Sequence, residues 1–247
     1  ILKKDYWDSI KSFVNAKKNK FKGTFEEAKE QVKRHIDYSI KNRLVSDVPL
    51  GILLSGGIDS SNLVLSLHRQ NITANTFSIG FHNKNTNELN FANKVAKILK
   101  TKHAYKYVNN KDCIENIQNV VNAYDEPFSD PSQIPTYMLC KFVKKNITVA
   151  ISGEGADELF GGYPRYKNIA SFWNKIKKQP KVFSELMEVF SESFSSSKYS
   201  YMRTIGKKFR KYSHTNLDSL YNDEMSRWRP DEKILIDRSF RGSYFEK

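Results

Sequence analysis

Apolar residues recur at two different spacings along the first part of the chain. Between Phe25 and Leu44 they follow steps of three and four residues, which predicts an amphipathic helix. Thr24 and Glu27 predict a capping box at its start. Leu50–Leu54 is instead a short, wholly apolar run, typical of a strand buried on both faces of a parallel sheet. Helix-like and strand-like runs then alternate, which predicts an α/β fold with a doubly wound parallel sheet.

The alternation predicts a definite series of elements. Helices are expected at 60–69, 88–100, 111–123 and 136–144, and further strands at 73–81, 103–108 and 147–151. The helix at 88–100 is expected to place Phe91, Val95, Ile98 and Leu99 on one side. The strand at 147–151 is expected to be buried, and the strand order to be about 3-2-1-4-5.

Three segments differ in character. Residues 1–23 are polar and are interpreted as a leading segment or linker from a missing domain. Residues 24–170 carry the alternating pattern and form the predicted core. In residues 171–247 helix-like pieces alternate with serine-rich stretches, which predicts a mainly helical C-terminal region that is expected to be truncated. The start lacks Met and a signal core, as expected for the middle of a longer gene product.

Composition narrows the class of protein. A net charge of +14 is typical either of a nucleic-acid-binding surface or of a lysine-rich surface in general, and the scattered lysines without an RNA-binding aromatic motif favour the second, so no nucleic-acid partner is expected. No apolar run is long enough to cross a bilayer, which predicts no membrane partner. Cys113 and Cys140 lie far apart without metal-ligand spacing, which favours a reducing, cytoplasmic setting.

The segment Ser55–Ser61, with the sequence SGGIDSS, follows a predicted buried strand and opens a predicted helix. Its glycines allow the backbone to approach a ligand closely, and a helix N-terminus favours anionic oxygens. A carboxylate such as Asp59 would be out of place facing phosphate alone. Its presence is explained if Mg²⁺ lies between it and the phosphate oxygens. The Walker A and Gly-x-Gly-x-x-Gly patterns are absent. The alternative is an ordinary tight turn.

A second segment, Ser152–Tyr163, follows the strand at 147–151. Glu154, Asp157 and Glu158 would repel one another there without a cation. In doubly wound sheets ligands bind outside the carboxyl ends of the strands, where the strand order reverses. We therefore expect this segment beside Ser55–Ser61. The alternative is a surface loop with acidic turn residues.

The first segment resembles the pyrophosphate loop of the N-type ATP pyrophosphatases, Ser-Gly-Gly-x-Asp-Ser. The second resembles the synthetase domain of the glutamine-hydrolysing (B type) asparagine synthetases. Further similar stretches are 6–8, 43–49, 77–81, 125–127, 130–132 and 165–166. The resemblance implies a ligase that uses ATP to convert aspartate to asparagine through β-aspartyl-AMP, releasing AMP and pyrophosphate. Residues 24–170 would be its ATP-pyrophosphatase core, and ammonia would come from glutamine in an N-terminal glutaminase domain.

The resemblance also implies roles for single residues. Asp59 and Asp157 would hold Mg²⁺, and Glu154 would act as the base that deprotonates attacking ammonium or the tetrahedral intermediate. ATP would be bound by residues of both segments and by strand residues that frame the nucleotide: Leu53, Ser55, Gly56, Gly57, Asp59, Ser60, Ser61, Ile79, Ser152 and Gly153.

Some features depart from the family pattern. Where the family has His-His, this chain has His103-Ala104, and His103 is interpreted as structural. The downstream stretch with a transition-state lysine is not recognisable, and only Asp237-Arg238 echoes it, so the chain alone is expected to turn over slowly. The stretches 125–127 and 130–132 are either ordinary turns or part of the amino-acid site.

Other functions stay open from the sequence. They are an amidotransferase for another carboxylate, such as a sugar acid, a tRNA-modifying N-type ATP pyrophosphatase, and a non-catalytic remnant. The charge favours the tRNA enzyme, whereas Glu154 and Asp157 oppose it. The partners implied are small-molecule substrates and the glutaminase domain, and a homodimer is left open.

Overall fold

The computed structural model describes residues 5–82, 88–126 and 130–226. It divides into two compact units, a first unit that extends to Glu154 and a second unit that begins at Gly155. Each unit is described by itself. The segment borders predicted at residues 23 and 170 stay predictions.

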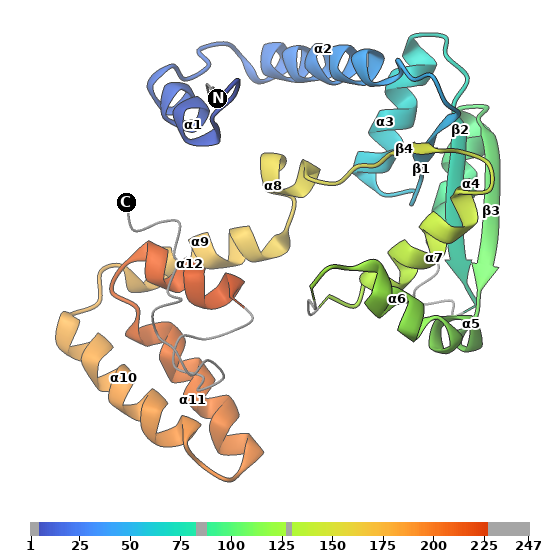
Figure 1. Cartoon of the computed structure of the whole chain (residues 1–247). Coiled ribbons are helices and arrows are strands. Elements are labelled where there is room, and N and C mark those ends of the chain that lie inside the picture. Colours follow the sequence, from blue (N-terminus) through green and yellow to red (C-terminus); the bar gives the residue numbers. More distant parts are fainter. Residues whose placement is uncertain (1–4, 83–87, 127–129, 227–247) are drawn as a thin grey trace, which may run out of the picture. The chain divides into compact units, whose positions relative to one another are not determined.

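The first unit alternates helices and strands as expected (Figure 1). Its strands are β1 (Leu50–Leu53), β2 (Asn75–Phe81), β3 (Lys102–Val108) and β4 (Val149–Ile151). Its helices are α1 (Ser9–Lys18), α2 (Phe25–Arg43), α3 (Ile58–Arg69), α4 (Leu89–Ile98), α5 (Asn110–Glu115), α6 (Ile117–Ala123) and α7 (Gln133–Val143).

Two helical details differ from the prediction. Helix α1 forms within the segment interpreted as a polar linker, where Asp8 caps it by accepting from the Lys11 amide (3.0 Å). The helix expected at 111–123 is broken at Asn116, which ends α5 and begins α6. The Asn116 side chain donates to the Asp112 carbonyl (2.8 Å), a local bond that competes with helix continuation.

All four strands in the described residues are parallel, in the order β3-β2-β1-β4. The predicted adjacency of β1 and β4 is confirmed, with Leu50 opposite Val149 and Ile52 opposite Ile151. Strands β3 and β4 are the outer strands of this sheet. A fifth strand is not found between residues 5 and 226 as far as these are described, so it stays a prediction.

Helices cover both faces of the sheet, which confirms the doubly wound class. Because alternate residues of a strand face opposite sides, Ile52 and Leu54 pack into a core cluster with residues of α2, α3 and α4. Leu53 packs on the other side, with Phe77 and Val143 of α7. The carboxyl ends of β1 and β4 are thus fixed from both sides.

Helix α2 is tied to α3 by one charged contact. Asp37 accepts hydrogen bonds from the guanidinium of Arg69 and from the buried hydroxyl of Ser66. The Arg69 side chain is the main cause that lowers the pKa of the Asp37 carboxyl below its ordinary value. The capping box of α2 is present as predicted, with Thr24 and Glu27 bonding each other's backbone amides.

The prediction that β4 is buried was wrong, and the apolar side predicted for α4 is only partly buried. In β4 Val149 and Ala150 are exposed, because this strand pairs only with β1 in the described residues. In α4 the buried residues are Leu89, Ala92 and Ala96, whereas Phe91 and Ile98 are exposed. Val95 and Leu99, expected on the same side, are partly buried and pack against the core.

The second unit is helical throughout its described residues, in agreement with the prediction for 171–247 as far as it is described. It contains α8 (Ala156–Phe160), α9 (Pro164–Ile176), α10 (Lys181–Ser195), α11 (Ser200–Ser213) and α12 (Leu217–Met225). Figure 1 shows α10 and α11 side by side as a hairpin. No helix among the residues that could be searched is both long and apolar enough to cross a membrane.

Candidate functional site

The segment Ser55–Ser61 forms the turn between β1 and α3, as the sequence predicts. Gly57 is the N-cap of α3, and no side chain caps this helix end by a hydrogen bond. The first amides of a helix have no partner within the helix, and the helix dipole adds positive potential there. The turn therefore presents backbone donors suited to an anion. We call residues 55–61 the phosphate loop, after its predicted role.

The phosphate loop is held in shape by its own serines. The hydroxyl of Ser60, which is only 6% exposed, accepts from the Ser55 amide (3.2 Å) and bonds the Ser55 hydroxyl (3.0 Å). It also donates to the Gly57 carbonyl (3.3 Å), while the Gly57 amide donates to the Ser55 hydroxyl (3.2 Å). These bonds fix the loop without any ligand.

Gly56 lies against the first turns of α4. Its φ is +85°, in the left-handed region that favours glycine. A Cβ at this position would overlap the backbone nitrogen of Ala92 and come within 2.6 Å of the Phe91 carbonyl carbon. The glycine is therefore required both by its backbone angle and by the close approach of α4.

One hydroxyl of the loop is buried without a partner. Ser61 Oγ is inaccessible to solvent, and no hydrogen bond to it is found in the described residues. A buried polar atom left unsatisfied is costly, so such atoms are rare in folded proteins. An orphaned donor beside a helix N-terminus fits the phosphate group that the resemblance implies.

The segment after β4 reaches the phosphate loop through Gly153. A Cβ on Gly153 would lie 3.1 Å from both the Asp59 Cβ and the Ser60 nitrogen. The predicted juxtaposition of the two segments is thus present at Gly153. Next to it, Glu154 is exposed, and its amide is 3.4 Å from the Ser152 hydroxyl.

Asp157 and Glu158 lie in the second unit, in the first turn of the short helix α8. The hydroxyl of Tyr163 donates to Glu158 (2.9 Å), and this bond is the main cause that raises the pKa of Tyr163 to about 12. The guanidinium of Arg165 lies 4.6 Å from the centre of the Tyr163 ring. Glu158 therefore has a structural partner within its own unit.

Strand residues predicted to frame a nucleotide lie at the carboxyl ends of β1 and β2. Leu53 and Ile79 are both half-buried, and the Leu53 side chain belongs to the core cluster with Phe77. Any contact of Leu53 with a ligand would thus come from its backbone. Sequence reasoning did not single out Ser78, a polar residue within an apolar strand whose hydroxyl donates to the Leu54 carbonyl.

Other highlighted residues lie elsewhere. His103 is near the amino end of β3, where its Nδ1 is 2.9 Å from Thr76 Oγ1 and burial lowers its pKa. It is remote from the carboxyl ends of the strands, which supports the structural interpretation. Asp130 accepts from the Ser132 amide (2.8 Å), a turn bond typical of Asp. Pro127 and Asp237-Arg238 lie outside the described residues.

Metal-binding side chains are not clustered in three or more anywhere in the residues described. A Mg²⁺ site beside phosphates needs no such cluster, because Mg²⁺ is usually held there by one or two carboxylates together with substrate phosphates and water. Asp59, in the first turn of α3, is a carboxylate of the kind such a site uses.

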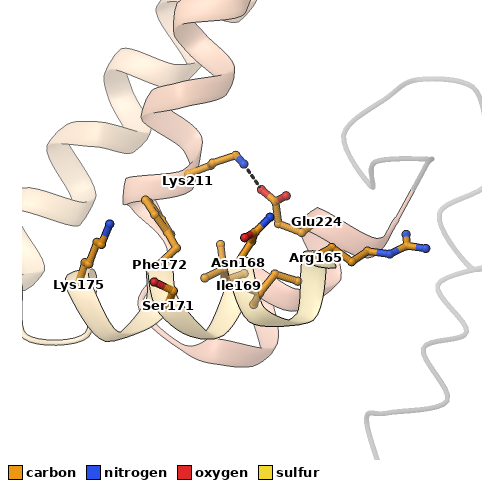
Figure 2. Close-up of a pocket in the computed structure, with 9 residues that line it drawn as sticks. Arg165, Asn168, Ile169, Ser171, Phe172, Lys175, Lys211 and Glu224 are labelled. Carbon is orange, nitrogen blue, oxygen red and sulfur yellow. Dashed lines mark ion pairs between the residues drawn. The ribbon is translucent and has the colours of Figure 1, made fainter. Parts of the chain in front are cut away.

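A pocket of about 310 Å³ lies in the second unit, and none of the predicted site residues lines it (Figure 2). Lys211 and Glu224 form an ion pair across it (2.7 Å). It is lined by Arg165, Asn168, Ile169, Ser171, Phe172, Lys175, Lys211, Leu220 and Glu224.

A doubly wound parallel sheet with a glycine-rich turn at a helix N-terminus places this chain among α/β proteins, a class in which ligands typically bind at the carboxyl ends of the strands. Comparison with known proteins gives the family. The family model described as asparagine synthase matches residues 31–240, and the chain belongs to this family.

Several curated proteins are similar to slightly more than half of this chain. Asparagine synthetase [glutamine-hydrolyzing] 1 of Bacillus subtilis (strain 168) is 39% identical over 138 residues, 56% of this chain and 22% of that protein. Putative asparagine synthetase [glutamine-hydrolyzing] 2 of Methanocaldococcus jannaschii is 40% identical over 141 residues, 56% of this chain and 27% of that protein. The chain thus matches only about a quarter of the length of these relatives.

Among solved structures, the chain is similar to an NH3-dependent NAD synthetase from Campylobacter jejuni. The sequence identity is 16% and the TM-score 0.34, over 77% of this chain and 95% of that one. No argument rests on so slight a likeness.

Proposed function

We propose that this chain is the ATP-using, amide-forming part of a glutamine-dependent asparagine synthetase. The observation that carries the proposal is the pairing of the phosphate loop, with its orphaned Ser61 hydroxyl, and the segment at Gly153 beside Asp59. Membership of the asparagine synthase family and relatives named glutamine-hydrolyzing asparagine synthetases support the same activity.

The proposed first step forms an acyl-adenylate. A side-chain carboxylate oxygen of aspartate attacks the α-phosphorus of ATP, the bond to the β-phosphate oxygen breaks, and pyrophosphate leaves. We assign pyrophosphate to the amides of α3 and to Ser55, Gly56, Gly57, Ser60, Ser61 and Ser152, and the nucleotide to Leu53, Ile79 and Gly153. Donors that are already fixed stabilise developing charge without reorganisation.

Asp59 and Asp157 are the residues that would hold Mg²⁺. When bound, the ion would neutralise charge on the phosphate oxygens. Asp59→Asn is expected to raise the Mg²⁺ concentration needed for half-maximal pyrophosphate release, because one negative ligand is lost.

In the proposed second step, ammonia attacks the activated carbonyl carbon and AMP leaves, which gives asparagine. Glu154 would accept the proton that the attacking nitrogen releases. Its carboxylate is exposed, so it can reach a small nucleophile. The ammonia would be supplied from glutamine by a separate domain.

The test is aspartate-dependent exchange of labelled pyrophosphate into ATP by the full chain, with asparagine measured after addition of an ammonium salt. Glu154→Gln is expected to retain exchange and to lose about a hundredfold in asparagine formation, the low end of what general base catalysis contributes, about 10²–10⁴-fold. Glu115→Gln, an exposed residue of α5, is the matched control. If Glu154→Gln formed asparagine at the wild-type rate, Glu154 would not be the base.

Replacing aspartate in the same assay separates the other activities. If exchange required a sugar acid, that acid and not aspartate would be the carboxylate that the chain activates. If the chain bound tRNA and showed no amino-acid-dependent exchange, a tRNA-modifying enzyme would be favoured. Absence of exchange with every acid would contradict the proposal.

A further inference from the structure

Ser78 of β2 is buried beside Leu54, the residue immediately before the phosphate loop. Its side chain is 3% exposed, and its hydroxyl donates to the carbonyl of Leu54, the residue before the loop. The register of the sheet places Leu53 opposite Phe77, so this contact continues the β1–β2 pairing one residue beyond the end of β1. The Leu54 amide already donates to the Phe77 carbonyl (2.9 Å).

The Leu54 carbonyl and the Ser55 amide belong to one peptide group. Because a peptide group is planar, fixing its oxygen and its N–H fixes the rotation of the whole plane. Ser78 holds the oxygen, and Ser60 accepts from the N–H (3.2 Å). This plane sets the direction in which the chain leaves β1, and therefore the direction of the loop donors.

We propose that Ser78 is a positioning residue, which orients the phosphate loop for the phosphates of ATP without contacting them. The inference rests on the proposed function and adds to it a residue from a neighbouring strand. A hydrogen-bonded chain runs from Ser78 through this peptide group to Ser60 and on to the Gly57 carbonyl. Such chains are stronger than their separate bonds, because each polarises the next.

Thr76 provides a matched control on the same strand. It is two residues earlier, on the same face and fully buried, and its hydroxyl bonds Thr101 (2.8 Å) and His103 (2.9 Å) instead of the loop. Removing either hydroxyl deletes one buried hydrogen-bonding group from β2. Only Ser78 lies at the carboxyl end of the sheet.

The experiment compares Ser78→Ala with Thr76→Val in the full chain by pyrophosphate exchange. Ser78→Ala is expected to raise the KM for ATP about fivefold, the effect of one net hydrogen bond, and to leave the KM for aspartate unchanged. Thr76→Val should leave both values unchanged, and Ser78→Thr, which keeps the hydroxyl, should restore the wild-type KM for ATP. Equal kinetic effects of Ser78→Ala and Thr76→Val would overturn the proposal.

Hydrogen exchange of the ligand-free chain gives a second readout that does not depend on catalysis. Ser78→Ala should speed exchange of the Ser55 and Gly57 amides about fivefold relative to Thr76→Val, since their acceptors lose their fixed orientation. If wild type shows no pyrophosphate exchange, the proposed function fails while this measurement still decides the positioning role. Equal protection of the two amides in both variants would refute it.

Discussion

Gly56 and Gly155 have nearly the same φ angle, but the space around the two residues differs. Gly56 in the phosphate loop has φ +85°, and Gly155 in the segment after β4 has φ +86°. Around Gly56 a Cβ would overlap α4, whereas around Gly155 nothing lies within 4 Å of the added atom. The first loop is therefore constrained by packing as well as by conformation, and the second by conformation alone.

Replacing each of these two glycines by alanine is expected to give the largest difference in the free energy of unfolding. Gly155→Ala should lower the free energy of unfolding by about 1–2 kcal/mol, the strain of a left-handed residue. Gly56→Ala should lower it by about 2–5 kcal/mol, because overpacking adds to that strain. Urea unfolding of both variants measures the difference. Equal losses would show that α4 does not restrict the loop.

Gly153→Ala tests where the two segments meet. The added Cβ would lie 3.1 Å from Asp59 and Ser60, so a small shift can relieve it. We expect a loss of about 1 kcal/mol in stability, with a larger loss for Gly153→Val. Pyrophosphate exchange should fall in both variants, since the shift moves Asp59. If alanine and valine behave alike in unfolding and exchange, the close contact is absent.

Removing the orphaned hydroxyl should separate binding from stability. Ser61→Ala eliminates a buried polar atom without a partner in the described residues, so the free energy of unfolding should be unchanged or slightly higher. Affinity for magnesium pyrophosphate should fall about fivefold, as expected for one lost hydrogen bond. Calorimetric titration checks this, and full affinity in the variant would contradict a phosphate contact by Ser61.

A small effect on stability is also expected where α2 is tied to α3. Asp37→Asn should cost about 1 kcal/mol at neutral pH, because a charge-assisted contact with Arg69 is weakened. Glu30→Gln, which affects only an exposed pair with Lys33, is the control and should change stability by less than about 0.5 kcal/mol.

The same contact has a defined pH dependence. Folding lowers the pKa of Asp37, chiefly through Arg69, so the unfolded chain binds this proton more tightly. The stabilisation is fully present above the unfolded pKa of about 4 and is lost as the pH falls through the lower folded value. Unfolding free energies measured from pH 6 down to about 2 should show this loss in wild type and a smaller one in Asp37→Asn. Parallel curves for the two proteins would refute it.

Local patterns predicted the strand order and the phosphate loop well. The capping residues Thr24 and Glu27 and the apolar run before Ser55 carry their information within a few neighbouring residues. Parallel strands place their carboxyl ends at one edge, so the meeting of Gly153 with Asp59 followed from topology.

Contacts between distant parts of the sequence could not be predicted in the same way. Nothing local to Gly56 indicates that Ala92 lies against it, and nothing near Ser78 indicates that Leu54 is its acceptor. The exposure of Phe91 could not be predicted either, because the buried face of α4 depends on how closely the helix approaches the sheet.

The two outer strands of the sheet formed by the described residues have consequences for how this chain behaves at high concentration. An unpaired strand edge can recruit strands of other molecules, and natural proteins counter this with short edge strands or with lysines. Strand β4 has only three residues, whereas β3 has seven and carries Lys102 and Lys106. Charge repulsion thus protects the longer edge. Salt that screens these lysines should promote association through β3 first.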